Sequence, residues 1–417
     1  MISKLPPPLT LALSQIVLEG SAFLRNLILA RLLGAEQMGL AIALALGVRA
    51  LEMLGDFGLE RYLVQVRAAE LPGVRGTVHL VQVFKGFVLM GFAAIVAAPL
   101  SMAINPALNP AVFLLASSAL VLRGFINCDY RERQRSNDFS GLLYVEGISN
   151  LLTVILVAPI AMATRDYSAL AWASVLQATL LCLLSHLLAR RAMTFAMNGP
   201  MLRKAFKFGI PIACNGMLMF MAMQGDRLIV AMNFSAEDLA KFAISAQLTL
   251  LPALVGARFL LSLDLPRFSK LRAQPAELRR QYGMRLKWVV LTATAMLFAF
   301  AKLGTQTVAW LYGVAFVPTP ELMTLLAAAA GLRLIRAVPN TLLLSRGKTL
   351  MMLVCNAPRL IALLVALAFV AQGYGLVTIV AIGMFSEALS LLIGMGAVAT
   401  MDRKAVRPTL PLPEMTR

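Results

Sequence analysis

The sequence predicts an all-α integral membrane protein whose twelve or so transmembrane helices form two six-helix bundles. Apolar residues make up 59% of the 417 positions and charged residues only 14%, whereas roughly a quarter of the residues of a soluble domain are charged. The apolar residues gather in long runs, and most Lys and Arg residues lie between these runs. Together these features exclude a water-soluble enzyme.

Twelve apolar runs are long enough to cross a bilayer, because a spanning helix needs about 20 mostly apolar residues. The first run lacks the small-residue cleavage site of a signal peptide, so we expect the protein to retain it. Very short connectors, such as 34–37 and 372–374, predict antiparallel pairs of neighbouring helices. The expected spans are 9–33, 38–64, 78–103, 108–127, 140–163, 167–188, 208–232, 239–263, 288–311, 320–344, 351–371 and 375–399.

The positions of Lys and Arg predict that both termini are cytoplasmic. Of the 38 basic residues, 27 lie in the termini and the even-numbered connectors, three lie in the odd-numbered connectors, and eight lie within spans. Cytoplasmic loops retain positive charge, so the even-numbered connectors should face the cytoplasm. The segment Asp129–Arg135 in the fourth connector is interpreted as part of this topology signal rather than as a lipid-binding patch.

A shift of 201 residues places Ala30–Met38 over Ala231–Leu239, and each copy joins the outer end of an odd-numbered span to the next span. Six spans separate the copies, so both have the same orientation in the membrane. The sequence therefore predicts a parallel repeat related by an axis along the membrane normal, with a substrate path between two bundles. The expected domains are 1–200, 201–400 and a cytoplasmic tail, 401–417.

Several other classes of site are not expected. The net charge of +18 is spread over short segments between apolar runs, so we expect no nucleic-acid binding. The four cysteines and two histidines have no metal-ligand spacing, and no GxxxxGK[ST] phosphate loop is present for ATP hydrolysis. The sequence predicts neither a metal nor a cofactor.

Eight basic residues lie within predicted spans, where each costs about 2.5–3.5 kcal/mol on insertion scales. We therefore expect them to face a wet, cationic cavity or a charged partner. These residues are Arg25, Arg49, Arg227, Arg258, Lys302, Arg333, Arg336 and Arg359.

In the first half, Arg25 and Arg49 lie at a similar depth near the membrane midplane, at about 1.5 Å of rise per residue. Their bidentate donors could replace the water around an anionic headgroup. Arg49, Glu52 and Asp56 have i, i+3, i+7 spacing and predict one polar helix stripe. The stripe either lines a transport path, or Arg49 and Glu52 neutralise each other. Asp56 fits a solvated helix end, and Glu19 lies on a polar face of the first span.

In the second half, Asp226 and Arg227 are adjacent and cannot share a helix face, which favours a structural salt bridge to another helix over substrate contact. Arg258 lies towards the cytoplasmic end of the eighth span. Arg333 and Glu387 lie at depths that would allow them to pair. A carboxyl group buried that deeply could couple proton entry to a conformational change, and we treat this as a hypothesis.

The segment Arg25–Gly39, with Gly55–Leu59 and Leu63–Gln65, resembles the opening of the polysaccharide-biosynthesis flippases, a branch of the multidrug/oligosaccharidyl-lipid/polysaccharide superfamily. In the second half Phe208–Pro211, Asp226–Leu228, Leu311–Gly313 and Phe316 are similar to the same family. The resemblance implies the superfamily fold, in which two bundles rock around a central cavity. Related lipid II flippases carry further arginines where this chain has Glu19 and, approximately, Glu52, a departure that favours the polysaccharide branch.

The resemblance implies a transporter that flips a polyprenyl-diphosphate-linked oligosaccharide, such as an O-antigen or exopolysaccharide repeat unit, to the periplasmic leaflet of the bacterial inner membrane. The implied partners are this substrate and membrane lipids, with a polysaccharide polymerase and chain-length machinery as candidates. The expected substrate contacts are Arg25, Arg49, Glu52, Arg258 and Arg333. The expected ion-coupling or helix-locking residues are Glu19, Asp56, Asp226, Arg227 and Glu387.

Two alternatives remain open. A multidrug and toxic-compound exporter of the same superfamily should line its cavity with acids, and the eight basic residues within spans argue against it. A membrane glycan polymerase or ligase would need a catalytic loop on the outer face. The expected outer connectors have at most about ten residues, so we predict a transporter and not an enzyme.

Overall fold

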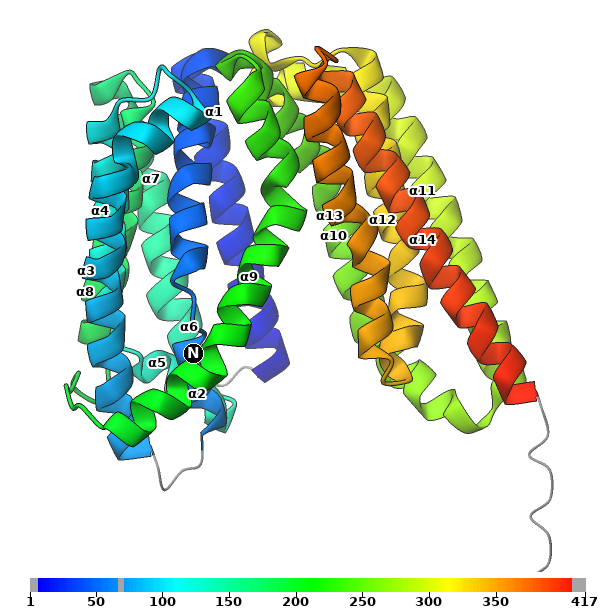
Figure 1. Cartoon of the computed structure of the whole chain (residues 1–417), viewed down its shortest axis with the longest axis horizontal. Coiled ribbons are helices and arrows are strands. Elements are labelled where there is room, and N and C mark those ends of the chain that lie inside the picture. The colour runs from blue at the N-terminus through cyan, green and yellow to red at the C-terminus, as the bar shows by residue number, and fades with distance from the viewer. Residues whose placement is uncertain (1–6, 67–70, 407–417) are drawn as a thin grey trace, which may run out of the picture. The chain divides into compact units, whose positions relative to one another are not determined.

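The computed structural model describes residues 7–66 and 71–406, and nearly all of this part of the chain is helical (Figure 1). The α-helices are α1 (Pro7–Leu54), α2 (Leu59–Gln65), α3 (Leu71–Ile104), α4 (Pro110–Gly124), α5 (Asp129–Glu132), α6 (Ser140–Leu142), α7 (Ile148–Thr164), α8 (Ser168–Leu187), α9 (Gly199–Asn233), α10 (Ala236–Lys270), α11 (Pro275–Tyr312), α12 (Pro320–Ser345), α13 (Thr349–Ala371) and α14 (Leu376–Val406). A π-helical turn, η4 (Leu143–Gly147), joins α6 to α7. Of the predicted tail, 401–417, the part beyond Val406 lies outside the described residues.

The number of membrane spans agrees with the prediction. Ten helices of the described chain are long and apolar enough to cross a membrane, and an eleventh span forms if α4 and the segment Asp129–Ser136 count as one bent span. This count treats α1 as one span, although its 48 residues would extend about 72 Å, more than twice the thickness of a bilayer core. The backbone of α1 is interrupted at Gly34, where φ is 78° and ψ is 176°. Dividing α1 there gives the twelve predicted spans.

The interruption of α1 at Gly34 and the break between α9 and α10 lie at equivalent positions of the predicted repeat. Gly34 shifted by 201 residues falls on Ser235, which separates α9 from α10. The two connectors also touch, because a Cβ atom on Gly39 would lie 1.7 Å from the carbonyl oxygen of Ala236. Glycine at position 39 therefore permits a backbone approach that any side chain would prevent.

The predicted second span, 38–64, is wrong at its C-terminal end. Helix α1 ends at Leu54, and α2 is a separate helix that begins at Leu59. Between them Gly58 adopts a left-handed conformation with φ of 58°, and its N–H donates to Oδ1 of Asp56 at 3.1 Å. An aspartate that accepts from the backbone two residues later, followed by a left-handed glycine, ends a helix. The segment Gly55–Gly58 contains two glycines and an aspartate, a local turn signal, but the predicted span followed the apolar residues on either side of it.

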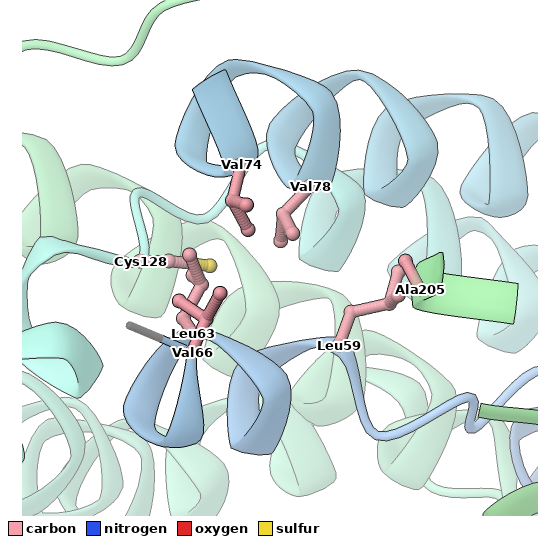
Figure 2. Close-up of a cluster of buried hydrophobic side chains, with 7 residues drawn as sticks. All are labelled: Leu59, Leu63, Val66, Val74, Val78, Cys128 and Ala205. Atoms are coloured by element: carbon pink, nitrogen blue, oxygen red, sulfur yellow. The ribbon is translucent and has the colours of Figure 1, made fainter. Parts of the chain in front are cut away.

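Helix α2 is held in place by an apolar cluster (Figure 2). Its buried side chains pack against the beginning of α3, against the segment before α5 and against α9. The members of this cluster are Leu59, Leu63, Val66, Val74, Val78, Cys128 and Ala205. Arg135 completes the attachment, because its Nη1 donates to the carbonyl oxygens of Leu63 and Val64 at 2.9 and 3.1 Å. The short helix is thereby fixed beside α3.

The charged segment Asp129–Arg135 makes intramolecular ion pairs. Glu132 accepts from Arg75 with both carboxylate oxygens at 2.8 Å and also from Arg191 at 2.8 Å. Arg133 donates to Asp129 at 2.7 Å. Glu132 and Asp129 are buried, so the segment ties α3 to the chain that follows α8. This structural role comes in addition to the predicted topology signal.

The chain divides into two compact units. The first contains the described residues up to Lys241 together with Leu311–Phe316, and the second contains Phe242–Trp310 and the described residues from Val317 onward. Helix α9 lies beyond the predicted boundary at residue 200 and packs against α1 and α3 of the first unit. In the second unit α14 packs against both α12 and α13.

We expect Gly39→Ala to lower the free energy of unfolding by about 1–3 kcal/mol, because the new methyl group would overlap the carbonyl group of Ala236. Thermal unfolding of the purified protein in detergent measures the change. Gly20→Ala is the matched control, since no atom lies within 4 Å of its Cβ position in α1, and it should be neutral or stabilising. Equal loss of stability in both variants would contradict the close approach.

Glu132→Gln should destabilise the first unit by about 3 kcal/mol, because it leaves two guanidinium groups without their buried carboxylate. A shift of the unfolding midpoint to lower temperature is the expected readout. Arg280→Gln removes a surface ion pair with Glu277 and should leave the midpoint unchanged. If the two variants unfold at the same temperature, the buried ion pairs of Glu132 do not stabilise the fold.

Candidate functional site

The first unit contains a polar cavity of about 830 Å³, within the range of 300–1,000 Å³ that is typical of ligand pockets. Its wall is formed by α1 near both its beginning and its end, the break after α1, α2, the middle of α3, and the end of α4. Tyr130, Arg131 and Gln134, the η4–α7 region and α8 complete it. The cavity therefore lies within a single unit of the chain.

Ten charged side chains line this cavity, and their formal charges balance. The lining acids are Glu19, Glu52, Asp56, Glu60 and Glu146, and the lining bases are Arg49, Arg61, Lys85, Arg123 and Arg131. The cationic cavity expected from the basic residues within spans was a central one between two bundles, and it stays a prediction. In this cavity of the first unit the acids balance the bases, because Glu60 and Glu146 face it together with Glu19 and Glu52.

Glu52 lies at the centre of the charged wall. One carboxylate oxygen accepts from Nη1 of Arg49 at 2.5 Å, and the other accepts from Nη1 of Arg123. The Arg49 side chain is 54% exposed and Glu52 24% exposed, so both remain accessible to a ligand. Arg49 and Glu52 therefore neutralise each other and also line a cavity, and a role of this cavity in transport stays a prediction.

Arg25 lies behind the cavity wall. Its Nη1 donates to Oε1 of Gln177 at 3.2 Å, Nε2 of Gln177 donates to Oδ1 of Asn150 at 2.8 Å, and Nδ2 of Asn150 donates to the backbone oxygen of Glu146 at 2.7 Å. Gln177 and Asn150 line the cavity, and Arg25 does not. The Nε atom of Arg25 is buried and has no hydrogen-bond partner among the described residues. Arg25 thus orients lining amides and has no direct place in the wall.

Glu19 and Asp56 both line the cavity, but Asp56 does not extend the predicted helix stripe. It lies in the break after Leu54, where its side chain accepts from Gly58. Arg49 and Glu52 lie on one helix with the predicted spacing, whereas Asp56 lies beyond the end of that helix.

Four basic residues of the wall were expected in connectors and not within spans, namely Arg61, Lys85, Arg123 and Arg131. Arg131 pairs with Glu60 at 3.1 Å and with Glu146. The sequence could have indicated that Arg123 lies within the helical bundle, because this residue falls inside the predicted span 108–127. Lys85 lies in the interior of α3, a helix that begins at Leu71 and so starts earlier than the predicted span.

The remaining predicted residues do not belong to the lining of this cavity. Arg227 is on α9 and donates to Gln224 at 3.0 Å, and neither it nor Asp226 belongs to the lining. Arg258 is an exposed residue of α10 in the second unit. The predicted pair of Arg333 and Glu387 is present in the second unit, with a shortest distance of 2.5 Å.

Solved structures share this fold. A lipid II flippase, MurJ, in an inward closed conformation aligns over 94% of this chain and 89% of its own, with 14% identity and a TM-score of 0.73. An inward-facing multidrug resistance MATE family transporter of the MOP superfamily aligns over 96% of this chain and 100% of its own, with 14% identity and a TM-score of 0.67. These likenesses establish the fold.

The sequence itself matches a family model described as polysaccharide biosynthesis protein over residues 28–321. No curated protein matches the chain. The matched region covers most of the predicted spans and the whole cavity wall apart from Leu18 and Glu19. The chain therefore belongs to the polysaccharide biosynthesis protein family and is a multi-pass membrane protein with the fold of MATE transporters and MurJ.

Proposed function

We propose that this protein flips a polyprenyl-diphosphate-linked oligosaccharide from the cytoplasmic to the periplasmic leaflet of the bacterial inner membrane by alternating access. Such a reaction would supply repeat units for O-antigen, lipopolysaccharide or exopolysaccharide synthesis. The observation that carries the proposal is a polar cavity with two arginines on one carboxylate, Arg49 and Arg123 on Glu52, in a member of a polysaccharide biosynthesis family.

The chemistry of the wall suits a diphosphate headgroup. A diphosphate loses its hydration when it enters the membrane, and guanidinium groups can replace that water with bidentate, charge-assisted hydrogen bonds. Arg49 and Arg123 both pair with Glu52, so they are not left as uncompensated charges. A phosphate group entering the cavity would exchange with the carboxylate of Glu52.

Five amide side chains suit the sugar part of the substrate, because each offers both donors and an acceptor to hydroxyl groups. They are Gln65, Gln82, Gln134, Asn150 and Gln177. Two of them, Asn150 and Gln177, are oriented by the hydrogen bonds that begin at Arg25. These amides support binding of a glycan without specifying which sugar it is.

The excess of Lys and Arg in the even-numbered connectors supports a cytoplasmic location for the end of the first unit that carries α2 and α5. Arg61 and Arg131 of the cavity wall belong to these connectors. We infer that substrate enters the cavity from the cytoplasm. A polymerase and chain-length machinery would then use the product outside, so this chain itself need not be an enzyme.

A drug exporter is the second candidate, because five acids line the cavity and organic cations would bind to acids. Three of these acids, Glu52, Glu60 and Glu146, already pair with arginines. This pairing favours an anionic ligand, which would compete for the arginines. The experiment below separates the two candidates.

Deletion of the gene should reduce surface polysaccharide and cause the lipid-linked oligosaccharide to accumulate on the cytoplasmic side. Complementation with Arg49→Ala or Arg123→Ala should restore about 1–10% of the export, because each lost charge-assisted hydrogen bond is worth roughly 1.5–3 kcal/mol. Quantification of both glycan pools measures the effect.

Arg280→Ala serves as the matched control, since Arg280 is an exposed arginine outside the cavity, and it should restore export fully. All variants must be compared at equal membrane abundance. If deletion leaves both glycan pools unchanged and reduces only the efflux of cationic dyes, the flippase proposal is wrong and the exporter replaces it.

A further inference from the structure

A second group of charged residues lies deep in the second unit, outside the cavity described above. Arg333 and Arg336 lie on α12, Arg359 on α13 and Glu387 on α14. At about 1.5 Å per residue, each is 15–24 Å from the beginning of its helix, and thus far from water at either membrane surface. We call these four residues the Glu387 cluster.

One carboxylate receives all three guanidinium groups. Oε1 of Glu387 accepts from Nε and Nη2 of Arg333 at 2.9 and 2.5 Å and also from Nη1 of Arg359. Nη2 of Arg336 lies 3.2 Å from Oε2 of Glu387. Glu387 is 2% exposed and Arg336 8% exposed, so the cluster is almost completely withdrawn from solvent.

The hydrogen bonding of the cluster is incomplete. Oε2 of Glu387 and Nε of Arg336 are both buried and have no hydrogen-bond partner among the described residues. Arg336 uses Nη1 to donate to Oδ1 of Asn356 at 2.7 Å. A buried guanidinium that leaves a donor unused loses the hydration of that donor without replacement. The Nε of Arg336 therefore offers an unused position to an acceptor.

The charges of the cluster are also unequal. Arg333 and Arg336 alone bring two positive charges to one carboxylate, and Arg359 donates to that same group. A single ion pair is enough to tie helices together, as Arg285 and the buried Asp264 show in this unit at 2.9 Å. Additional arginines at this depth are costly unless an anion accompanies them. Of Arg333 and Arg336, a structural role in joining helices therefore explains one and leaves the second unexplained.

We propose that the Glu387 cluster is a second anion-binding site, which takes a phosphate or diphosphate group. Glu387 is its resident counter-ion, and the entering phosphate oxygens accept from Arg336 Nε and from donors that contact Glu387 in this structure. Arginine forks match phosphate oxygens in a bidentate manner. The anion has two possible sources, the headgroup of a lipid-linked diphosphate or a free inorganic anion. The first source rests on the proposed function, and the second does not.

The test measures binding of inorganic pyrophosphate to the purified full-length protein in lipid nanodiscs. Every variant carries Arg49→Ala and Arg123→Ala, so that the cavity of the first unit contributes little. Stabilisation of the unfolding midpoint by pyrophosphate reports binding, with methanesulfonate at equal ionic strength as the reference. Glu387→Gln should bind pyrophosphate about tenfold more tightly, because the competing carboxylate is gone, and Arg336→Gln about tenfold more weakly.

Asp264→Asn is the matched control, because it removes a buried carboxylate from an ion pair outside the cluster and should leave pyrophosphate binding unchanged. If Arg336→Gln does not fold, the comparison of Glu387→Gln with Asp264→Asn still decides the matter. Equal pyrophosphate binding by these two variants, or no stabilisation beyond that by methanesulfonate, would overturn the proposal.

A competition arm identifies the source of the anion. Displacement of pyrophosphate by polyprenyl diphosphate added to the nanodiscs would assign the site to a lipid headgroup, and failure to displace it would assign the site to a free anion. Because this assay does not involve transport, it is independent of the gene-deletion experiment. Tight pyrophosphate binding together with unchanged glycan pools on deletion would reject the proposed function and retain the anion site.

Discussion

The cost of placing charge in apolar surroundings governs this structure. A chain that is 59% apolar carries many arginines and acids in its helices, and such groups persist there only with partners or beside water. The first unit meets this requirement by pairing, with Glu52 between Arg49 and Arg123 and Arg131 between Glu60 and Glu146. These pairs make an open polar cavity compatible with a membrane-embedded bundle.

The break between α1 and α2 brings charged residues into the cavity wall. Helix α1 ends at Leu54, and the chain passes through Gly58, which has a left-handed backbone, into α2, so that Asp56, Glu60 and Arg61 join Glu52 in the cavity wall. The apolar cluster around Leu63 and the capping by Arg135 then hold α2 beside α3. A uniform helix over 38–64 would have carried Glu60 and Arg61 away from this wall.

The two charged sites differ in a way that bears on ligand binding. The cavity of the first unit is balanced and accessible, so under the proposed function its arginines would exchange a carboxylate for a ligand at small electrostatic cost. The Glu387 cluster is buried, with more guanidinium than carboxylate groups and unused hydrogen-bonding atoms on both Arg336 and Glu387. An excess of guanidinium groups favours binding of an additional anion, whereas equal numbers of acids and bases favour exchange of a carboxylate for a ligand.

The sequence by itself determined the class of protein and predicted about twelve apolar spans and the connector at Gly34. It also placed Arg333 and Glu387 at depths that allow them to pair, because hydropathy and helical depth follow from composition and spacing alone. The resemblance of short motifs also identified the family. Tertiary structure decided which charges meet. Arg123, Arg131, Glu60 and Glu146 come from four separate segments, and Arg25 lies one amide behind the wall it was expected to form. Spacing along a chain constrains only residues of one helix, whereas a cavity wall depends on how several helices pack and where each one ends.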